Sequence, residues 1–194
     1  GGDKKVKKKG FNARDSIKYW FSNYDTNYWL KNGFNKKEMN IFSSPPIKEI
    51  YKLKIERIFW SYYFKWSPQN HFYYSARNTN FKTNYLRSEG TYSKYASIDD
   101  KFDGFHYYFM FLKFGIGRAT SDACQEIRNK QINRQEGVQL VRKYDGEFPH
   151  KYYDEFLEFC GLSEKEFIKI CDKWRSPVAW IKKNDIWKRR AIVS

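Results

Sequence analysis

The sequence predicts an α/β protein that is mainly α-helical, and two observations support this class. A run of β-branched and aromatic residues from Arg57 to Phe64 is typical of a buried strand, and the following Ser67-Pro68 is typical of a helix start. From Ser97 onward, the apolar residues have helical spacing and follow capping residues. We therefore expect a partial α/β layer in residues 1–90 and an all-helical subdomain in residues 91–194.

The first part of the chain is expected to hold few regular elements. Apolar residues close to helical spacing predict one helix over residues 15–30. After the turn at residues 43–46, residues 47–53 have the pattern of a short helix, and the strand over residues 57–64 follows. The helix that starts after Ser67 is expected to end near Asn78.

Five helices are expected in the second part of the chain. Three of their starts have the spacing of a capping box, namely Ser97 with Asp100, Asn133 with Glu136, and Ser163 with Glu166. Glycines and a proline supply the stop signals. The expected helices run from Ser97 to Gly115, from Thr120 to Asn129, from Asn133 to Tyr144, from Tyr152 to Phe159 and from Ser163 to Trp174.

Composition places the chain among folded proteins without a membrane span. Of its 194 residues, 41% are hydrophobic and 21% are aromatic, whereas disordered chains are poor in aromatic residues. No stretch reaches the roughly 18 apolar residues of a membrane span, and no signal-peptide pattern is found. Three cysteines without a CxxC pair argue against a disulfide framework. We expect a cytoplasmic protein, and the start at Gly1 without Met indicates part of a longer chain.

The formal net charge of +15 has two interpretations. A strong basic excess can mark a protein that binds nucleic acid. Here the excess is mostly Lys and accompanies abundant Asn, Ile, Phe and Tyr, which is the residue set expected from an AT-rich genome. Local basic clusters occur only near the ends, at Lys4–Lys9 and Lys182–Arg190. We interpret the charge as compositional bias rather than as a nucleic-acid surface.

The segment Phe114–Asp122 combines a Gly-interrupted turn with an Arg at the start of a helix. Glycines expose backbone N–H groups, a helix start adds further N–H groups with a partial positive charge, and Arg adds a two-pronged donor. The same spacing also fits a C-cap at Gly115, a close helix crossing at Gly117 and a surface Arg118. The predicted anion or substrate site consists of Gly115, Gly117, Arg118, Thr120, Ser121 and Asp122.

A larger set of residues around this segment forms a family signature. The set comprises Glu89-Gly90-Thr91, Asp99-Asp100, His106, Lys113-Phe114-Gly115, Gly117-Arg118-Ala119, Asp122-Ala123, Ile127-Arg128, Arg134, Glu136 and Lys143-Tyr144-Asp145-Gly146. It resembles the C-terminal signature of the N-acetyl sugar amidotransferases, a family of lipopolysaccharide, O-antigen and pseudaminic or legionaminic acid biosynthesis. The resemblance covers about residues 45–180, with a very specific block in the middle.

The resemblance implies the C-terminal half of a larger enzyme. In such an enzyme, an N-terminal ATP pyrophosphatase domain uses ATP and Mg²⁺ to adenylylate an oxygen of a sugar substituent, and ammonia from a glutaminase subunit displaces AMP. The sugar is nucleotide-linked or nonulosonic, and the product is an amide or amidine. Residues 1–90 would then be the C-terminal remnant of an adenine-nucleotide α-hydrolase-like sheet layer.

The sequence departs from this family at its start. The SGGxDS phosphate loop is absent, Gly1-Gly2-Asp3 does not replace it, and the family's N-terminal Cys cluster is absent as well. We therefore expect neither ATP binding nor activity from this chain alone, and we assign no catalytic residue and no metal ligand. What the resemblance implies for this chain is that Arg118 and the N–H groups around Thr120 and Ser121 hold an anionic group of the sugar or the phosphate of AMP.

Six further residues are candidates for a substrate pocket, each with a structural alternative. Two acidic residues fit sugar hydroxyls or Mg²⁺, and Asp100 also suits a helix first turn. His106 also fits packing on an aromatic helix face, and Arg128 also fits an ion pair with a neighbouring Glu. The two aromatic residues follow the predicted strand, where α/β sheets bind ligands, but also fit a core. These candidates are Tyr63, Trp66, Asp99, Asp100, His106 and Arg128.

Two functions from other classes compete with the amidotransferase. Exposed Tyr and Trp on a basic domain are typical of a nucleic-acid-binding module that stacks bases. The chain also fits a non-catalytic scaffold that docks a glutaminase subunit. Neither accounts for the spacing of the signature residues, so the amidotransferase is the preferred interpretation.

Overall fold

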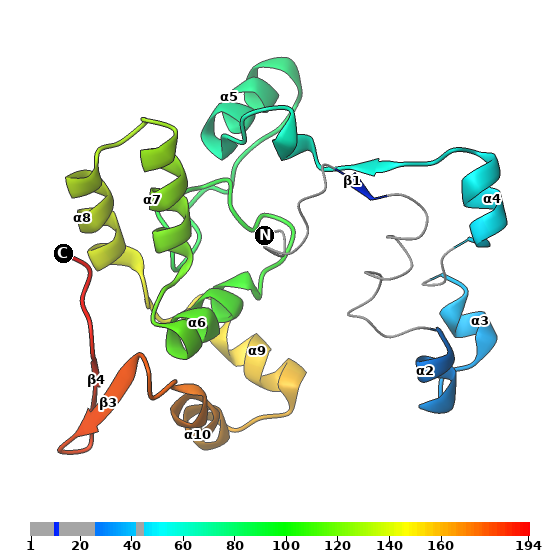
Figure 1. Ribbon diagram of the computed structural model, residues 1–194. Coiled ribbons are helices and arrows are strands. Elements are labelled where there is room, and N and C mark those ends of the chain that lie inside the picture. The colour runs from blue at the N-terminus through cyan, green and yellow to red at the C-terminus, as the bar shows by residue number, and fades with distance from the viewer. Residues whose placement is uncertain (1–9, 12–25, 42–44) are drawn as a thin grey trace. The chain divides into compact units, whose positions relative to one another are not determined.

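The computed structural model describes residues 10–11, 26–41 and 45–194. Within these residues it contains nine α-helices, one 3₁₀ helix and two antiparallel pairs of strands, so the mainly α-helical class is confirmed (Figure 1). The chain divides after Trp66 into two compact units, residues 1–66 and 67–194. None of the described helices combines the length and the apolar character that a bilayer crossing requires.

The first unit contains short elements. Two antiparallel strands pair Gly10 with Ile58 and Phe11 with Arg57. Asn35 caps a one-turn helix with a complete capping box to Glu38. The part of the expected helix over residues 15–30 that precedes Thr26, and the basic cluster at residues 4–9, lie outside the described residues. The elements are β1 (Gly10–Phe11), α2 (Thr26–Lys31), α3 (Lys36–Met39), α4 (Ile47–Lys52), β2 (Arg57–Ile58) and the 3₁₀ helix η2 (Trp60–Tyr62).

The strand predicted over residues 57–64 is wrong beyond Ile58. The chain turns into η2, where the N–H groups of Tyr63 and Phe64 donate to the carbonyl of Trp60 at 2.9 and 3.0 Å. A buried strand needs partner strands on its edges for its backbone groups, and among the described residues β2 has only the two-residue partner β1. The aromatic run is therefore half exposed, and its pattern misled the prediction because aromatic residues favour strands only where a sheet covers them.

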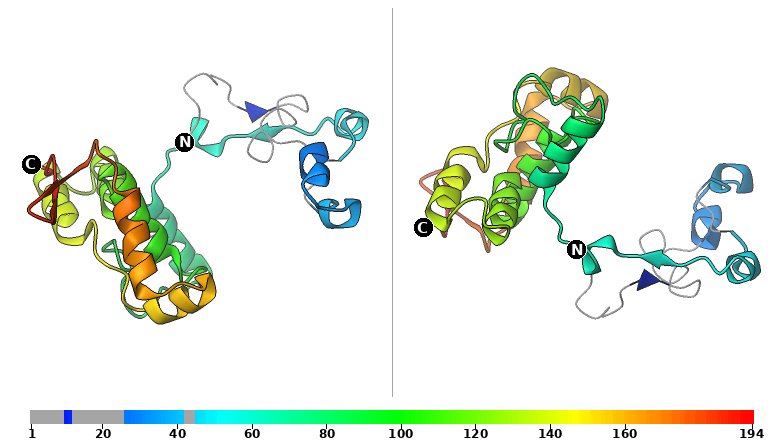
Figure 2. Two further views of the ribbon diagram at one scale, coloured as in Figure 1. Left: turned by 90° about the horizontal axis from the view of Figure 1, so that it is seen from below. Right: turned by 90° about the horizontal axis from the view of Figure 1, so that it is seen from above.

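The second unit is a helical domain with a C-terminal hairpin. Figures 1 and 2 show α7 and α8 side by side, and α6 packs against both α7 and α10. Its hydrophobic core consists of Phe105, Phe111, Leu112, Phe167, Cys171 and Trp180. Its elements are α5 (Pro68–Asn78), α6 (Asp103–Phe114), α7 (Arg118–Arg128), α8 (Arg134–Tyr144), α9 (Tyr153–Cys160), α10 (Glu164–Trp174), β3 (Trp180–Lys183) and β4 (Ile186–Arg189).

Aromatic packing holds α6, α9 and α10 together. The rings of Phe105 on α6 and Phe156 on α9 stack with centroids 3.9 Å apart. Phe167 on α10 is 1% exposed and meets the edge of Phe105 at 6.3 Å between centroids. Complete burial of a Phe side chain stabilises a fold by roughly 1.5–3 kcal/mol. The 21% aromatic content of the sequence therefore supplies much of this core.

Local capping signals predicted several helices correctly. The boxes at Asn133 and Ser163 are both complete, with each side chain accepting from the N–H three residues on. The helix over Pro68–Asn78 has the predicted bounds, and Gly115 ends α6 in the left-handed conformation. The box predicted at Ser97 is wrong, because α6 begins only at Asp103 and Ser97 itself has a φ of +54°.

The all-helical prediction for residues 91–194 misses the hairpin β3–β4. Asn184 and Asp185, both with positive φ, form its two-residue turn. Two indoles anchor the hairpin to the helices, because Trp180 Nε1 donates to the carbonyl of Leu112 at 2.8 Å and Trp187 Nε1 donates to Asp172 at 2.9 Å. The Asn-Asp pair between apolar residues was the available signal for this turn.

Residues 67–90 belong to the helical unit in the structure, whereas the sequence predicts a boundary near residue 90. Arg87 donates to Glu147 at 2.6 Å, and Asn84 N–H donates to the carbonyl of Lys94 at 3.0 Å. These long-range bonds are invisible to local sequence patterns.

Candidate functional site

Three segments of the signature meet at the start of α7. Gly90 N–H donates to Glu147 at 2.8 Å, and the Gly90 carbonyl accepts from the N–H of Ala119 at 3.2 Å. Thr91 Oγ1 donates to Asp122 Oδ2 on α7 at 2.6 Å. The Glu89-Gly90-Thr91 loop, the Gly-rich turn and the segment after α8 are therefore joined by hydrogen bonds, although up to 57 residues separate them.

The start of α7 holds a carboxylate of the protein itself. Asp145 accepts from Gly117 N–H at 2.8 Å, from Thr120 N–H at 3.0 Å and from the Thr120 hydroxyl. A helix N-terminus favours an anion because its N–H groups are unpaired and its dipole is positive there. The donors that the sequence predicts for a ligand at Gly117 and Thr120 are thus used by Asp145.

The other backbone positions of the predicted anion site also have internal roles. Gly115, with a φ of +72°, ends α6, and a Cβ there would lie 2.9 Å from Ala179. Ser121 N–H donates to the carbonyl of Gly117 at 3.4 Å. The C-cap at Gly115 is confirmed. At Gly117 the nearest group is the Asp145 carboxylate and not a crossing helix, because an added Cβ there would lie 2.7 Å from Asp145 Oδ1. Binding of an external anion in this segment stays a prediction. The group that remains available for it is the Arg118 side chain, because the backbone groups have partners within the protein.

Replacing Asp145 by alanine is expected to lower the free energy of unfolding by about 2 kcal/mol. The change leaves the N–H groups of Gly117 and Thr120 without an acceptor, and lost caps or unpaired buried donors cost ~1–3 kcal/mol. Urea unfolding followed by circular dichroism measures the loss. Alanine at Glu158, an exposed residue of α9, is the control, and equal losses in both variants would contradict the capping role of Asp145.

Arg118 is held by two neighbours. Its Nε donates to Asp122 Oδ1 at 2.8 Å, and its Nη1 donates to the Tyr107 hydroxyl at 3.0 Å. Its guanidinium carbon lies 5.2 Å from the centroid of the Tyr107 ring. The Arg118 side chain remains 32% exposed, and its Nη2 has no partner among the described residues. One N–H edge of a fixed guanidinium is therefore available to a ligand.

Arg118, Asp122, Tyr107 and Ser97 form a polar cluster, whose charges keep Arg118 protonated. Burial acts to lower the pKa of Arg118, but the Asp122 carboxylate outweighs burial and the pKa is raised. Burial raises the pKa of the Tyr107 hydroxyl, although the hydrogen bond with Ser97 and the charge of Arg118 oppose the rise. The cluster therefore presents a permanent cation beside a neutral phenol.

Glu126 carries a buried carboxyl on α7. The residue is 8% exposed and accepts from the Tyr92 hydroxyl at 2.9 Å. Burial raises the pKa of Glu126, the bond from Tyr92 acts against the rise, and nearby Asp122 adds to it. Because the folded state holds this proton more tightly than the unfolded state, the contribution of Glu126 to stability falls as the pH rises from the unfolded to the folded pKa.

The variant Glu126→Gln is therefore expected to gain stability relative to the parent protein as the pH rises above about 4.5. Glutamine keeps an acceptor for Tyr92 but carries no charge, so it avoids the cost of ionising a buried carboxyl. Urea unfolding of both proteins between pH 4 and 7 measures the difference. Parallel stability curves would show that the Glu126 carboxyl has an ordinary pKa.

Four of the six candidate pocket residues lie in the second unit, at separate places. Asp100 lines a polar cavity, and its Oδ1 accepts from Phe102 N–H at 2.8 Å as a local cap. Asp99 is exposed next to it in the chain. His106 is also exposed, but it lines an apolar groove between α6 and α10 and not the polar cavity. Arg128 is exposed at the end of α7. The structure does not gather these residues into one site.

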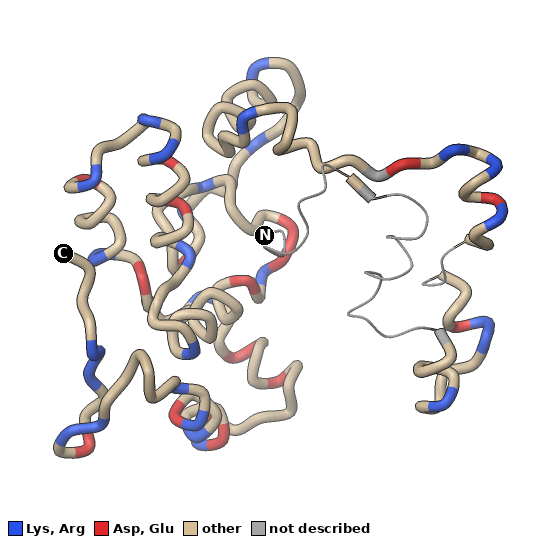
Figure 3. Tube along the Cα trace, viewed as in Figure 1, with Lys and Arg blue, Asp and Glu red and all other residues tan. Residues whose placement is uncertain are grey.

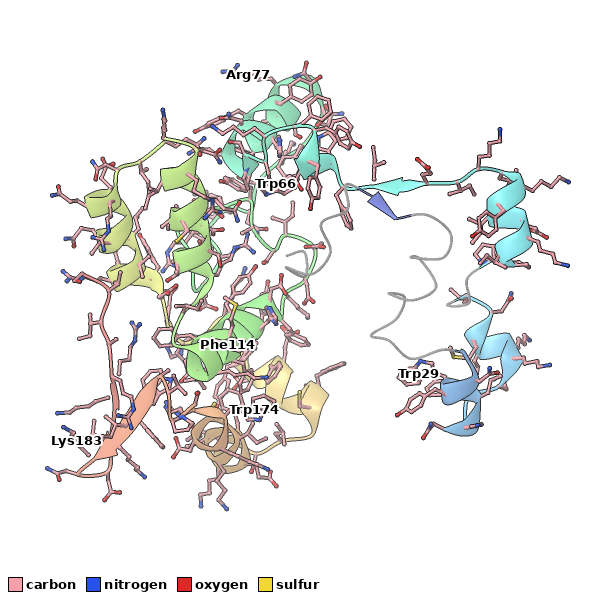
Figure 4. All side chains as sticks on the ribbon, in the orientation of Figure 1. Trp29, Trp66, Arg77, Phe114, Trp174 and Lys183 are labelled. Carbon is pink, nitrogen blue, oxygen red and sulfur yellow. The ribbon has the colours of Figure 1, made fainter. Side chains whose placement is uncertain are left out.

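The groove beside His106 is lined mainly by apolar side chains. Figure 4 labels Phe114 and Trp174, which close the ends of α6 and α10. Lys113 Nζ lies 5.4 Å from the ring centroid of Phe114 and 4.8 Å from that of Trp174. His106 thus has the aromatic surroundings that the packing interpretation implies, and a role as a base stays a prediction.

Tyr63 and Trp66 lie in the first unit, where both side chains are more than half exposed. The strand that was expected to carry them ends at Ile58. Tyr63 and Trp66 were assigned to a substrate pocket because they were expected at the end of a strand, and that strand ends before it reaches them. A role in ligand stacking stays a prediction.

Sequence reasoning missed three residues in and beside the polar cluster. The sequence places Asp145 in the family signature but not among the candidate site residues, and it predicts only a cap at Ser97. It does not single out Tyr107, whose hydroxyl bonds with Ser97 and accepts from Arg118. The helical spacing of Asp103 and Tyr107 was an available signal, because residues four apart share a face.

The described residues do not fit a magnesium–nucleotide site. No group of three or more His, Cys, Asp or Glu side chains in this part of the chain is arranged to hold a metal ion. Both oxygens of Asp122 already accept hydrogen bonds, and the first N–H groups of α7 are used by Asp145 and Gly90. We derive no ATP-dependent step from these residues.

Positive charge is spread over the second unit. Figure 3 shows Lys and Arg along several of its helices and on the hairpin rather than in one segment. This distribution agrees with the interpretation of the net charge as compositional bias.

Comparison with models of protein families identifies the family of the second part of the chain. A family model described as "LPS biosynthesis protein WbpG-like, C-terminal domain" matches residues 89–193, which is more than half of the chain. The match begins at Glu89, the first residue of the signature, and includes α6 to α10 and the hairpin. A search of curated proteins finds no match.

Proposed function

Because the chain belongs to the family of WbpG-like LPS biosynthesis proteins, whose C-terminal domain it carries, we propose that it is the C-terminal part of a sugar amidotransferase. The reaction couples the cleavage of ATP to AMP and pyrophosphate with the conversion of a sugar acyl or acetamido group into an amide or amidine. The nitrogen comes from ammonia, and a glutaminase subunit supplies it. The loop that binds the phosphates of ATP belongs to a part of the enzyme other than the described residues.

The observation that supports this function is the convergence of the signature residues on Arg118. Thr91 and Asp122 hold Arg118 through a chain of hydrogen bonds, and Tyr107 fixes the second side of the guanidinium. A fixed guanidinium with one exposed edge is suited to a carboxylate or a phosphate. We assign Arg118 to the anionic group of the sugar or to the phosphate of departing AMP.

The proposal is tested by complementation. The chain is combined with a separately expressed ATP pyrophosphatase half of such an enzyme and its glutaminase. We expect AMP release that requires glutamine, a nucleotide-linked or nonulosonic sugar, and this chain. AMP release that is independent of this chain would contradict the proposal, as would salt-sensitive retention on single-stranded DNA without any amidation.

A further inference from the structure

The polar cavity that contains Asp100 is formed by three segments of the second unit. Residues 84–89, residues 97–104 and residues 151–152 line it. Its volume is about 120 Å³, below the ~300–1,000 Å³ of pockets that enclose a whole drug-sized ligand. The cavity therefore fits one part of a ligand rather than a complete sugar nucleotide.

Some polar groups at the cavity already have hydrogen-bond partners within the protein, and others do not. Arg87 pairs with Glu147, and Glu89 accepts from the N–H groups of His150 and Lys151. Asp100 uses only Oδ1, so its Oδ2 has no partner among the described residues. The side-chain amide of Asn84 likewise has no hydrogen-bond partner there. One carboxylate oxygen and one amide are thus available to sugar hydroxyls, which both donate and accept.

Two lysines, Lys101 and Lys151, line the same cavity. Lys151 Nζ lies 4.8 Å and Lys101 Nζ lies 5.5 Å from the ring centroid of Tyr152. Lys101 also pairs with Glu155, whereas Lys151 forms no ion pair within the described residues. Of these two lysines, Lys151 is therefore the one whose charge is available to a ligand beside the Glu89 and Asp100 carboxylates.

The wall of the cavity carries a strained residue. Ser97 lines the cavity with a φ of +54°, in the left-handed region that residues other than glycine seldom adopt. Its hydroxyl bonds with the Tyr107 hydroxyl, which accepts from Arg118. Such strain is concentrated at binding and catalytic sites. The cavity is thus linked to Arg118 through two hydroxyl groups.

We propose that this cavity binds a sugar that carries an anionic group, with its hydroxyls on Asn84 and Asp100 and its negative charge on Lys151. The inference rests on the proposed function and adds the position and charge of the sugar. With the sugar anion on Lys151, Arg118 would bind the phosphate of AMP, the second of the two anions considered for it above.

The test measures binding to the full 194-residue chain by isothermal titration calorimetry at low salt, without ATP or glutamine. The probes are N-acetylneuraminic acid, its methyl ester and UDP-N-acetylglucosamine. We expect at least one of the two anionic sugars to bind about tenfold more tightly than the neutral ester. Preference for the acid identifies a carboxylate as the anionic group, and preference for the UDP sugar identifies a phosphate.

Two variants distinguish the contact of the negative charge with Lys151 from the contact of the sugar hydroxyls with Asp100. Lys151→Ala is expected to abolish the preference for the anionic sugar. Asp100→Asn, which keeps an acceptor for Phe102 N–H, is expected to weaken all the probes several-fold. Lys169→Ala on α10, outside the cavity lining, is the control and is expected to change nothing.

Two results would overturn the inference. One is equal binding of the anionic sugars and the ester, and the other is competition by inorganic phosphate as strong as that by the sugars. A complemented enzyme whose KM for the sugar is unchanged in Lys151→Ala would also overturn it, while leaving the proposed function intact. Absence of glutamine-dependent AMP release together with Lys151-dependent sugar binding would contradict the proposed function alone.

Discussion

Replacing Gly146 by alanine is expected to lower the free energy of unfolding by about 2–5 kcal/mol. Gly146 has a φ of +80°, and an added Cβ would lie 2.2 Å from Cε1 of Phe111. The left-handed conformation costs an alanine ~1–2 kcal/mol, and overpacking a core costs ~1–3 kcal/mol more. Phe111 belongs to the hydrophobic core and packs on Trp180, so its ring has little room to move. Thermal and urea unfolding measure the loss.

Gly161 provides a matched control for this substitution. It also has a left-handed conformation, with a φ of +63°, but an added Cβ would meet no atom within 4 Å. Gly161→Ala is therefore expected to cost only the conformational part, about 1–2 kcal/mol. Equal losses at both positions would show that the Phe111 ring moves aside and that Gly146 is needed only for its backbone conformation.

Replacing Arg118 by alanine is expected to lower kcat of the complemented enzyme by about 10²–10³-fold, the usual cost of losing one donor that stabilises developing charge. The proposed function assigns its exposed guanidinium edge to an anion, and Arg118→Lys cannot restore a two-pronged contact. Most of the loss should therefore persist in the lysine variant. Steady-state AMP release with saturating sugar measures kcat.

A structural role of Arg118 is tested in the same variants. Loss of the guanidinium leaves Asp122, which is 13% exposed, with the Thr91 hydroxyl as its only partner among the described residues. The expected cost is about 1–3 kcal/mol of stability. Arg77→Ala, at an exposed position of α5 labelled in Figure 4, is the control. Unchanged kcat in a folded Arg118→Ala variant would contradict the assignment.

Helix starts and ends were predictable because their signals are local. The capping boxes at Asn133 and Ser163 involve residues three apart, so the sequence contains both partners. The same reasoning failed at Ser97, where a tertiary bond to Tyr107 and a left-handed backbone replace the cap. Capping spacing indicates a helix start only where no distant partner competes for the side chain.

The candidate site was only partly predictable for the same reason. The sequence predicts an external anion at the start of the helix that begins at Arg118, because glycines and a helix N-terminus favour one. The carboxylate that lies there is Asp145, 25 residues further along the chain from Thr120. No local pattern specifies such a contact.

By itself, the sequence determined the mainly helical class, the family of the second part of the chain and the aromatic composition of its core. These properties depend on residue types and on spacings of a few residues. Only the tertiary structure decided that the aromatic run after Arg57 stays exposed, that Asp145 uses the donors of α7, and that Asp100 and Lys151 share a cavity. Each depends on which distant groups meet, because a buried polar group or an unpaired strand edge is stable only where the fold supplies its partner.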